Sequence, residues 1–451
     1  MRGRARRTTF RALTAVALSL SAAGCGVVAR GQTDPPAAPE VRFYGTDGNM
    51  ANSFGDSFKD APGELNGMKG TVPLTPLTEE FKRRLRAIDP TLTDYNYSAE
   101  SYDAVVIASL AATAAHSTDS AAIAKQMVGV TSGDTPCDSI VECMNAAKAG
   151  RHIKYRGVSL QRSGFTQTGE PSTAMYAVET YGRDNKLEDA KTEFVSAGDD
   201  KNENKTAPPA PASTKTKTTD PLKIGILLPK TGGLAFQAPP MFAAVHLAAK
   251  EINEAGGVLG EPITMEDGDD GTSPDVAAKT VDRFVGLGVQ VIVGAAASGV
   301  SKAVLPKVIQ AGKVMISPSA TSDELSTIDD HGLFFRTSPP DVLQAKALND
   351  TIMRDGRTKI AIVARDDSYG KGLAENVQAN LRSAGIKPDN LKVSLYPAKD
   401  KYDPKADVDN IFAPIARDVK NFGADGVLLV GFDESAFVIK AMVAAGVRVQ
   451  S

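Results

Sequence analysis

The stretch from Val291 to Thr327 constrains the fold more than any other part of the chain. Val291 to Val293 and Val314 to Ser317 are short apolar runs of the kind that form buried strands, and the segment between them has the apolar spacing of an amphipathic helix. A strand, a helix and a second strand in this order predict a βαβ unit with parallel strands. We therefore expect an α/β fold.

The same alternation continues on both sides of this unit, from residue 221 to the C-terminus. Before it, LKIGILLP and PITMEDGDD read as strands, and each is followed by a helical pattern. After residue 337, TKIAIVARDD, KVSLYPA and GVLLVGF read as strands separated by helices. Two sets of alternating units predict two doubly wound parallel sheets.

Hydroxyl side chains follow the strands of the βαβ unit. Ser298 comes where the first strand gives way to the helix, and Ser319 and Thr321 follow the second strand. In an open parallel sheet these places lie at the carboxyl edge, where ligands bind, and a helix N-terminus attracts carboxylates. The pattern alone leaves two interpretations open: the hydroxyls cap helices, which it favours, or they bind a small carboxylate.

The first 39 residues predict export and anchoring rather than folded structure. Arginines between Arg2 and Arg11 precede an apolar run, Leu13 to Leu20, that is too short to span a bilayer permanently. The sequence Ala22-Ala23-Gly24-Cys25 resembles a bacterial lipobox, although that motif usually has Leu where this chain has Ala22. We expect a signal peptide over 1–24, lipid on Cys25 and a tether over 25–39; an ordinary secretory peptide is the alternative.

Composition and cysteine usage narrow the class of protein. The 42% hydrophobic and 23% charged residues are typical of a globular protein, and a net charge of -3 argues against nucleic acid as a partner. Four dispersed histidines lack metal-ligand spacing, so we expect no metal and no cofactor. If Cys25 carries lipid, Cys137 and Cys143 remain as a pair outside the cytoplasm, and we expect a structural disulfide between them.

The block MISPSATSDEL, together with the turn at Ser298 before it, resembles the carboxylate-binding part of the type I periplasmic solute-binding proteins. The resemblance is to their branched-chain amino-acid (Leu/Ile/Val) group, which feeds ABC importers. It implies two parallel-sheet lobes joined by a hinge, a small amino acid captured between them, ABC permease subunits as partners and a membrane attachment through the lipid anchor. It implies no catalysis, and no Ser-His-Asp, Cys-His or metal constellation can be assembled from the residues.

The same resemblance implies roles for individual residues. It places Ser298, Ser319 and Thr321 on the ligand carboxylate, and Asp47, within YGTDG, on the ligand ammonium in place of a residue that is often Glu. It places four residues around the ligand side chain: Tyr369, Phe432, Phe236 and Gln237. For Tyr369 and Phe432, packing in the hydrophobic core is the alternative. Phe432 stands where the family often has Tyr, and Gln237 occupies an aromatic position.

The order of the segments differs from that family, because the part resembling the second half of the fold comes first. We interpret the chain as a circular permutant: 40–72 in lobe 2, 73–150 in lobe 1, 151–195 as terminal strands of lobe 2, 221–340 in lobe 1 and 341–451 in lobe 2. Residues 196–220 include a charged, Pro/Thr-rich stretch without apolar period and predict a disordered linker. Two half-domains that complete each other between chains, or a deliberate rearrangement, are the alternatives.

A rival function within the same fold is a ligand-sensing module that binds an amino acid, an amide or a urea-like solute for signalling. The residues do not separate sensing from transport, and they do not identify the amino acid.

Overall fold

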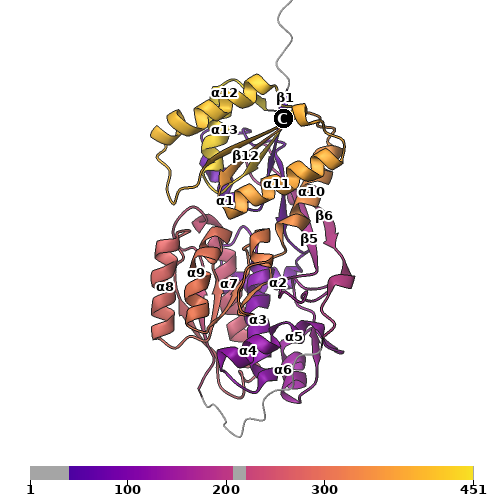
Figure 1. Cartoon of the computed structure of the whole chain (residues 1–451), viewed down its shortest axis with the longest axis vertical. Coiled ribbons are helices and arrows are strands. Elements are labelled where there is room, and N and C mark those ends of the chain that lie inside the picture. The colour runs from indigo at the N-terminus through magenta and orange to yellow at the C-terminus, as the bar shows by residue number, and fades with distance from the viewer. Residues whose placement is uncertain (1–39, 207–219, 450–451) are drawn as a thin grey trace, which may run out of the picture. The chain divides into compact units, whose positions relative to one another are not determined.

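The structure, a computed structural model, describes residues 40–206 and 220–449. The predicted signal peptide, Cys25, the tether and residues 207–219 of the predicted linker lie outside the described residues. Within the described ranges, the strands form a five-stranded sheet, an eight-stranded sheet and a two-stranded ribbon (Figure 1). No helix of those ranges is long and apolar enough to cross a membrane.

The five-stranded sheet is wholly parallel and comes from one continuous stretch of chain. Its order is β11-β10-β9-β7-β8. The strands and the helices between them are β7 (Lys223–Leu227), α7 (Ala238–Glu254), β8 (Thr264–Asp267), α8 (Pro274–Gly286), β9 (Val291–Gly294), α9 (Ser298–Gln310), β10 (Val314–Ser317) and β11 (Phe334–Arg336). The predicted βαβ unit is confirmed, with Val314 beside Val291 in parallel register.

The eight-stranded sheet is assembled from three stretches that are distant in sequence. Its order is β13-β12-β14-β1-β2-β5-β6, and β15 pairs with β1. The pairs are parallel except β2 with β5 and β5 with β6. Its strands are β1 (Glu40–Gly45), β2 (Lys69–Pro73), β5 (Thr173–Thr180), β6 (Glu193–Gly198), β12 (Ile360–Asp366), β13 (Leu391–Pro397), β14 (Gly426–Val430) and β15 (Arg448–Val449).

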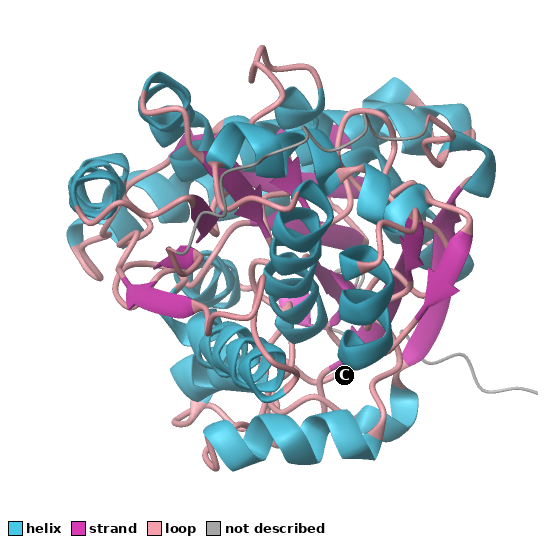
Figure 2. Ribbon diagram, turned by 90° about the horizontal axis from the view of Figure 1, so that it is seen from below, coloured by secondary structure: helices cyan, strands magenta, loops and turns pink. Residues whose placement is uncertain are grey.

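Helices accompany both sheets, as expected for doubly wound α/β layers, and the strands lie among them in Figure 2. Those that belong with the eight-stranded sheet are α1 (Asn52–Gly55), α10 (Asp341–Arg354), α11 (Ser368–Ser383), the π-helical turn η7 (Val408–Phe412), α12 (Ala413–Phe422) and α13 (Ser435–Ala444). Short 3-10 turns complete the connections: η1 (Asp56–Phe58), η2 (Asp189–Lys191), η3 (Asp200–Asn202), η4 (Ala235–Gln237), η5 (Asp323–Ser326) and η6 (Pro388–Asn390). We call this sheet and its helices the large-sheet half.

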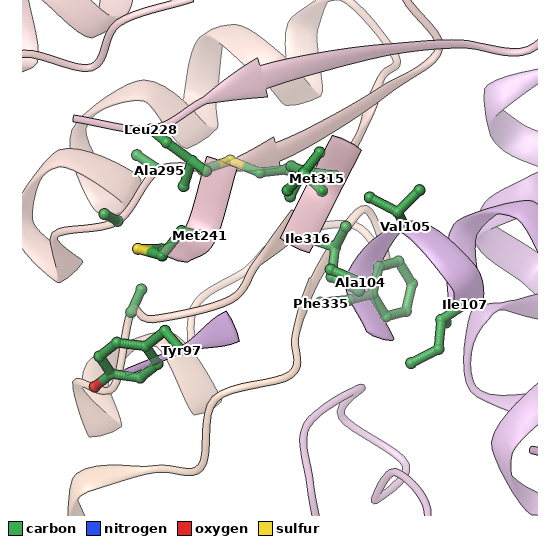
Figure 3. Packing of buried hydrophobic residues seen from close by; sticks show 14 of the residues in the cluster. Tyr97, Ala104, Val105, Ile107, Leu228, Met241, Ala295, Met315, Ile316 and Phe335 are labelled. Carbon is green, nitrogen blue, oxygen red and sulfur yellow. The ribbon is translucent and has the colours of Figure 1, made fainter. Parts of the chain in front are cut away.

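A group of helices from the first part of the chain packs on the five-stranded sheet, and together they form the small-sheet half. They are α2 (Glu79–Ile88), α3 (Ser98–Ala115), α4 (Ser120–Met127), α5 (Gly129–Ser132) and α6 (Ile140–Lys148). Helix α3 is buried on nearly every side and packs along α7, because its many alanines allow the two backbones to approach closely. In Figure 3 its residues Ala104, Val105 and Ile107 lie near Met315, Ile316 and Phe335 of the sheet.

Two expectations about chain segments need correction. The strand at Ile153, expected among the terminal strands of lobe 2, is β4 (Ile153–Tyr155) and pairs with β3 (Thr135–Cys137) in the two-stranded ribbon. Three-residue strands carry too little periodicity to be assigned to a sheet from sequence. The first residues of the expected linker are ordered, because β6 continues to Gly198 and the Asn204 amide donates to the Phe165 carbonyl at 2.8 Å.

The expected disulfide joins Cys137 to Cys143, with 5.3 Å between the two Cα atoms. It connects the ribbon strand β3 to the helix α6 that follows it. The bond is therefore a local cross-link within the small-sheet half.

Candidate ligand-binding site

One cavity collects most of the residues that the sequence singled out. It lies where the carboxyl ends of strands from both sheets come together. Its lining is Asp47, Gly48, Tyr97, Leu234, Gln237, Ala296, Ala297, Ser298, Ser319, Tyr369 and Phe432. Six of the expected ligand residues are among these, whereas Thr321 and Phe236 are not.

The loop after β1 holds Asp47 at the edge of the eight-stranded sheet. The Thr46 amide donates to Asn49 Oδ1 at 2.9 Å, and Asn49 Nδ2 donates to the Leu429 carbonyl of β14 at 3.0 Å. Gly48 is required because a Cβ there would lie 2.4 Å from the Gly431 carbonyl oxygen. Asp47 is consequently held against the ends of β1 and β14 with only 5% of its surface exposed.

Three side chains donate hydrogen bonds to the Asp47 carboxylate. Tyr97 Oη donates to Oδ2 at 2.7 Å, while Gln344 Nε2 and Tyr369 Oη donate to Oδ1, each at 2.9 Å. A carboxylate offers about four lone-pair sites, so Oδ2 keeps one for a further donor. Burial raises the pKa of the Asp47 carboxyl above its usual value, while the bonds from Tyr97, Gln344 and Tyr369 act in the opposite direction. A cation placed at Oδ2 would favour the charged form further.

Ser298, in the first turn of α9, presents a hydroxyl whose acceptor capacity is already used. Its Oγ accepts from the amides of Thr321 and Ser322, both at 3.1 Å. Because both lone pairs are engaged, the hydroxyl hydrogen is the part left to donate. The alternative that Ser298 caps this helix is not observed, since Ser298 is the first residue of α9 and the N-cap position is occupied by Ala297, which makes no side-chain cap. Thr321 stands behind Ser298 and contacts it through its backbone.

The turn from β9 into α9 presents the helix N-terminus to the same cavity. Gly294, at φ +130°, is needed because a Cβ would lie 1.9 Å from the Leu227 carbonyl oxygen. Asp270 Oδ2 accepts from the Ala296 amide at 2.9 Å and fixes the turn. The first amides of a helix have no intrahelical acceptor and carry a partial positive charge. This side of the cavity is therefore suited to an anion, whereas the Asp47 side is suited to a cation.

The aromatic side chains form the wall nearest the eight-stranded sheet. The rings of Tyr369 and Phe432 are stacked with centroids 5.6 Å apart, and the Arg365 guanidinium lies 3.9 Å from the centroid of Phe432. Arg365 is paired with the buried Glu434 at 2.9 Å. Tyr369 and Phe432 both belong to the hydrophobic core and line the cavity, so core packing and ligand contact are compatible.

The cavity is small in this arrangement, and the two halves touch across it. Tyr97 precedes α3 of the small-sheet half and bonds Asp47 of the other half, and Gln237 Nε2 donates to the Asp47 carbonyl. The cavity volume is about 20 Å³, which is room for roughly one water molecule. A ligand larger than a water molecule does not fit in this cavity as the halves are arranged here.

Two residues at the site were missed by sequence reasoning. Tyr97 adopts a left-handed backbone conformation, φ +58°, which turns its side chain toward Asp47, and no residue type there signals that turn. Gln344 lies inside α10, where glutamine normally reads as a surface residue, yet it is buried and also donates to the Thr71 carbonyl at 3.0 Å. Nothing in the local pattern points to either contact, because Gln344 and Asp47 are far apart in sequence.

Comparison with known proteins connects this geometry to a family. The sequence profile of the periplasmic binding proteins matches residues 221–451. The chain belongs to this family. Its members are substrate-binding proteins rather than enzymes, and the family implies a location outside the cytoplasm. The fold class expected from the sequence is confirmed.

Individual relatives match only part of their own length. Leu/Ile/Val-binding protein homolog 3 of Brucella melitensis is 28% identical over 214 residues, which are 47% of this chain and 54% of the relative. Leu/Ile/Val-binding protein BraC3 of Rhizobium johnstonii is 33% identical over 168 residues, 37% of this chain and 45% of the relative. The chain thus spans about half the length of the curated relatives it matches.

Solved structures show the same partial coverage. The leucine-, isoleucine-, valine-, threonine- and alanine-binding protein from Brucella ovis, in its closed conformation, aligns with 51% of this chain and 60% of its own. The sequence identity is 24% and the TM-score is 0.42.

Proposed function

We propose that the protein is a solute-binding protein that captures a small amino acid, branched-chain or related, between its two halves and delivers it to an ABC importer. The observation that carries this is the opposite polarity of the two sides of one cavity. Asp47 lies on one side with an unused lone-pair site, and the Ser298 hydroxyl with the N-terminus of α9 lies on the other.

A zwitterionic amino acid matches this polarity. Its ammonium would meet Asp47 Oδ2, and its carboxylate would meet Ser298 and the amides of α9, with Ser319 and Thr321 supporting through their backbone. The remaining lining is largely apolar or aromatic and would surround the ligand side chain: Leu234, Ala296, Ala297, Tyr369 and Phe432. Gln237 lies beside Asp47 in the lining. Phe236, the residue before it in the chain, would contact the ligand side chain from outside the present lining. Several relatives are named Leu/Ile/Val-binding proteins, which agrees with a ligand of this size.

The experiment is calorimetric titration of the full chain with leucine, isoleucine, valine, threonine and alanine. At least one should bind, and Asp47→Ala should abolish binding, because the ammonium loses its only carboxylate in the cavity. The matched control is Asp267→Asn, since Asp267 is an exposed carboxylate of the small-sheet half that lies outside the cavity. Binding that is unchanged in Asp47→Ala would refute the assigned role.

We also propose that Cys25 carries a lipid anchor.

We propose further that the order of the lobes is circularly permuted. The permutation is supported by the pairing of the first and last described strands. β15 runs parallel to β1, with Glu40 beside Arg448, so a chain leaving α13 could continue into β1. A rearranged chain, 220–449 followed by 40–206, should then fold and bind the same amino acid with similar affinity. Failure of that chain to fold would count against permutation.

A further inference from the structure

A second cavity lies beside the segment in which the chain passes from β2 to α2, between Pro73 and Glu79. Its volume is about 240 Å³, far larger than that of the first cavity. Residues of both halves line it: Glu179 and Asp189 come from the large-sheet half, and Lys82, Asp94 and Tyr95 come from the small-sheet half.

Glu179, on β5, is the unusual group in this lining. Only 6% of its surface is exposed, and its Oε2 is buried without a hydrogen-bond partner. A buried carboxyl without a donor is costly, because it loses its hydration and gains nothing in return. Burial, followed by the charges of Asp94 and Asp189, raises the pKa of Glu179 to about 8. The group therefore lacks a cation or donor that would favour its charged form.

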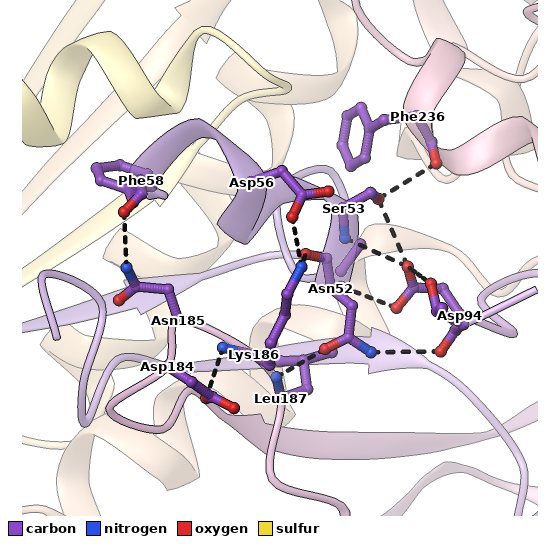
Figure 4. Close-up of polar contacts among 12 residues, drawn as sticks. Asn52, Ser53, Asp56, Phe58, Asp94, Asp184, Asn185, Lys186, Leu187 and Phe236 are labelled. Carbon is purple, nitrogen blue, oxygen red and sulfur yellow. Dashed lines mark hydrogen bonds and ion pairs between the residues drawn. The ribbon is translucent and has the colours of Figure 1, made fainter. Parts of the chain in front are cut away.

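The other charged groups of the lining do not supply that partner. The ammonium of Lys82 is 3.0 Å from Glu79 Oε1. Asp94 is engaged at the start of α1, where it accepts from the Asn52 amide at 2.8 Å and the Ser53 amide at 3.3 Å (Figure 4). The lining thus holds the carboxylates of Asp94 and Asp189 and the Glu179 carboxyl, against one lysine that is already paired, so acidic groups are in excess.

Apolar surface lies next to Glu179. Phe194 of β6 is paired with Ala177, two residues before Glu179 on β5, so the side chains of Phe194 and Glu179 stand on the same face of the sheet. Leu74 and Leu187 complete the apolar part of the lining. A volume of about 240 Å³ is below the range of roughly 300–1,000 Å³ that drug-sized ligands need. The volume and the lining suit a short aliphatic chain with a charged end.

We propose that this cavity is a second binding site, and that it takes a small organic cation, an ammonium or guanidinium on a short aliphatic chain, whose charge meets Glu179. The buried, unpartnered carboxyl, the surrounding acidic groups and the apolar walls together select a cation over a neutral molecule of the same size. The site is separate from the first cavity, because the two cavities share no lining residue.

The test is calorimetric titration of the full chain with putrescine, and with 1,4-butanediol as the uncharged molecule of the same length. Putrescine should bind saturably at one site, and butanediol should give no saturable heat. Glu179→Gln keeps the shape and removes the charge, and it should weaken putrescine binding by about tenfold or more. Glu193→Gln, an exposed glutamate on the adjacent strand, is the matched control and should bind as the parent does.

A second variant keeps the proposal falsifiable if Glu179→Gln does not fold. Phe194 is 42% exposed, so Phe194→Lys should be tolerated and would place an ammonium at the cavity, where it competes with putrescine. Absence of saturable putrescine binding at up to about 10 mM would overturn the proposal. The proposal would also be overturned if the parent and both folded variants bound putrescine with equal affinity. It would be overturned as well if butanediol bound as tightly as putrescine.

Discussion

The two large sheets are built from chain segments in very different ways. The five-stranded sheet uses a single run from Lys223 to Arg336, whereas the eight-stranded sheet joins strands from 40–73, 173–198 and 360–449. In the first, α7, α8 and α9 connect the strands from β7 to β10, and a loop with the turn η5 leads from β10 to β11. In the second, β1 pairs with β14, nearly 400 residues further along the chain. The large-sheet half therefore depends on contacts that form only when distant segments meet, and those contacts carry a loop-closure cost.

The largest effect should come from removing the first segment altogether. A chain of residues 207–451 keeps every strand of the five-stranded sheet but loses β1, β2, β5 and β6, and it uncovers the apolar face of α7 that α3 buries. Exposed strand edges and apolar surface favour association over folding. We expect no cooperative thermal transition by circular dichroism and aggregation on size exclusion. A monomer that melts cooperatively would show that the second part of the chain folds independently.

A smaller loss should follow from breaking one buried ion pair that joins the segments. Arg336 of β11 is 1% exposed and lies 2.5 Å from Glu170 Oε2, in the loop before β5. Glu170→Ala would leave the guanidinium charge buried and uncompensated, and it should lower the free energy of unfolding by about 3 kcal/mol. Urea denaturation measures this.

The control for that prediction is Glu193→Ala. Glu193 pairs with Arg354 at the surface, so its removal should change the unfolding free energy little. If the two variants lose the same stability, the buried pair does not hold the segments together.

The smallest effect should come from Asp355, which connects β1 and β2 to the loop after α10. Its carboxylate accepts from Lys69 Nζ at 2.6 Å and from Tyr44 Oη at 2.9 Å. Although burial opposes the change, these bonds and the charges of Lys69 and Arg42 hold the pKa of Asp355 below its usual value. Asp355→Asn should lower the free energy of unfolding at neutral pH by about 1 kcal/mol.

This contribution has a defined pH dependence. Because the pKa of Asp355 is lowered on folding, its stabilising effect is fully present above the usual carboxyl range, about pH 4, and is lost as the pH falls below it. The difference between the parent and Asp355→Asn should therefore shrink in urea titrations on acidification. Asp350→Asn, at a neighbouring exposed position, is the control. A difference that grows toward low pH would contradict the assignment.

The strands and helices of the βαβ unit in the five-stranded sheet were predicted in detail, and the assembly of the large-sheet half was not. The strands of the βαβ unit around Ser298 were located within a residue, because buried runs and helical spacing are local signals. The sequence did not predict the ribbon of β3 and β4 or the true end of β6, since short or exposed strands lack that signal. Apart from the strand at Ile153 and the start of the linker, the expected lobe boundaries remain predictions, as do the ligand roles.

At the site, the residues at strand ends were predictable and their partners were not. Asp47 and Ser298 follow apolar runs, so their place at a sheet edge can be inferred from the sequence and the family resemblance. Tyr97 and Gln344 reach Asp47 only because β1, α3 and α10 converge.

By itself, the sequence determined the alternation of strands and helices, the edge positions of Asp47 and Ser298, and the pairing of Cys137 with Cys143. The alternation and the edge positions follow from periodicity over a few residues, and the cysteine pairing follows from the cysteine count in a chain expected to be exported. Only the tertiary structure decided which carboxylates have donors, so that Asp47 has three and Glu179 has an unpartnered oxygen. The physical reason is that burial and hydrogen bonding depend on side chains brought together from segments that are 50 to 322 residues apart, as the three donors to Asp47 are, and no local pattern predicts such contacts.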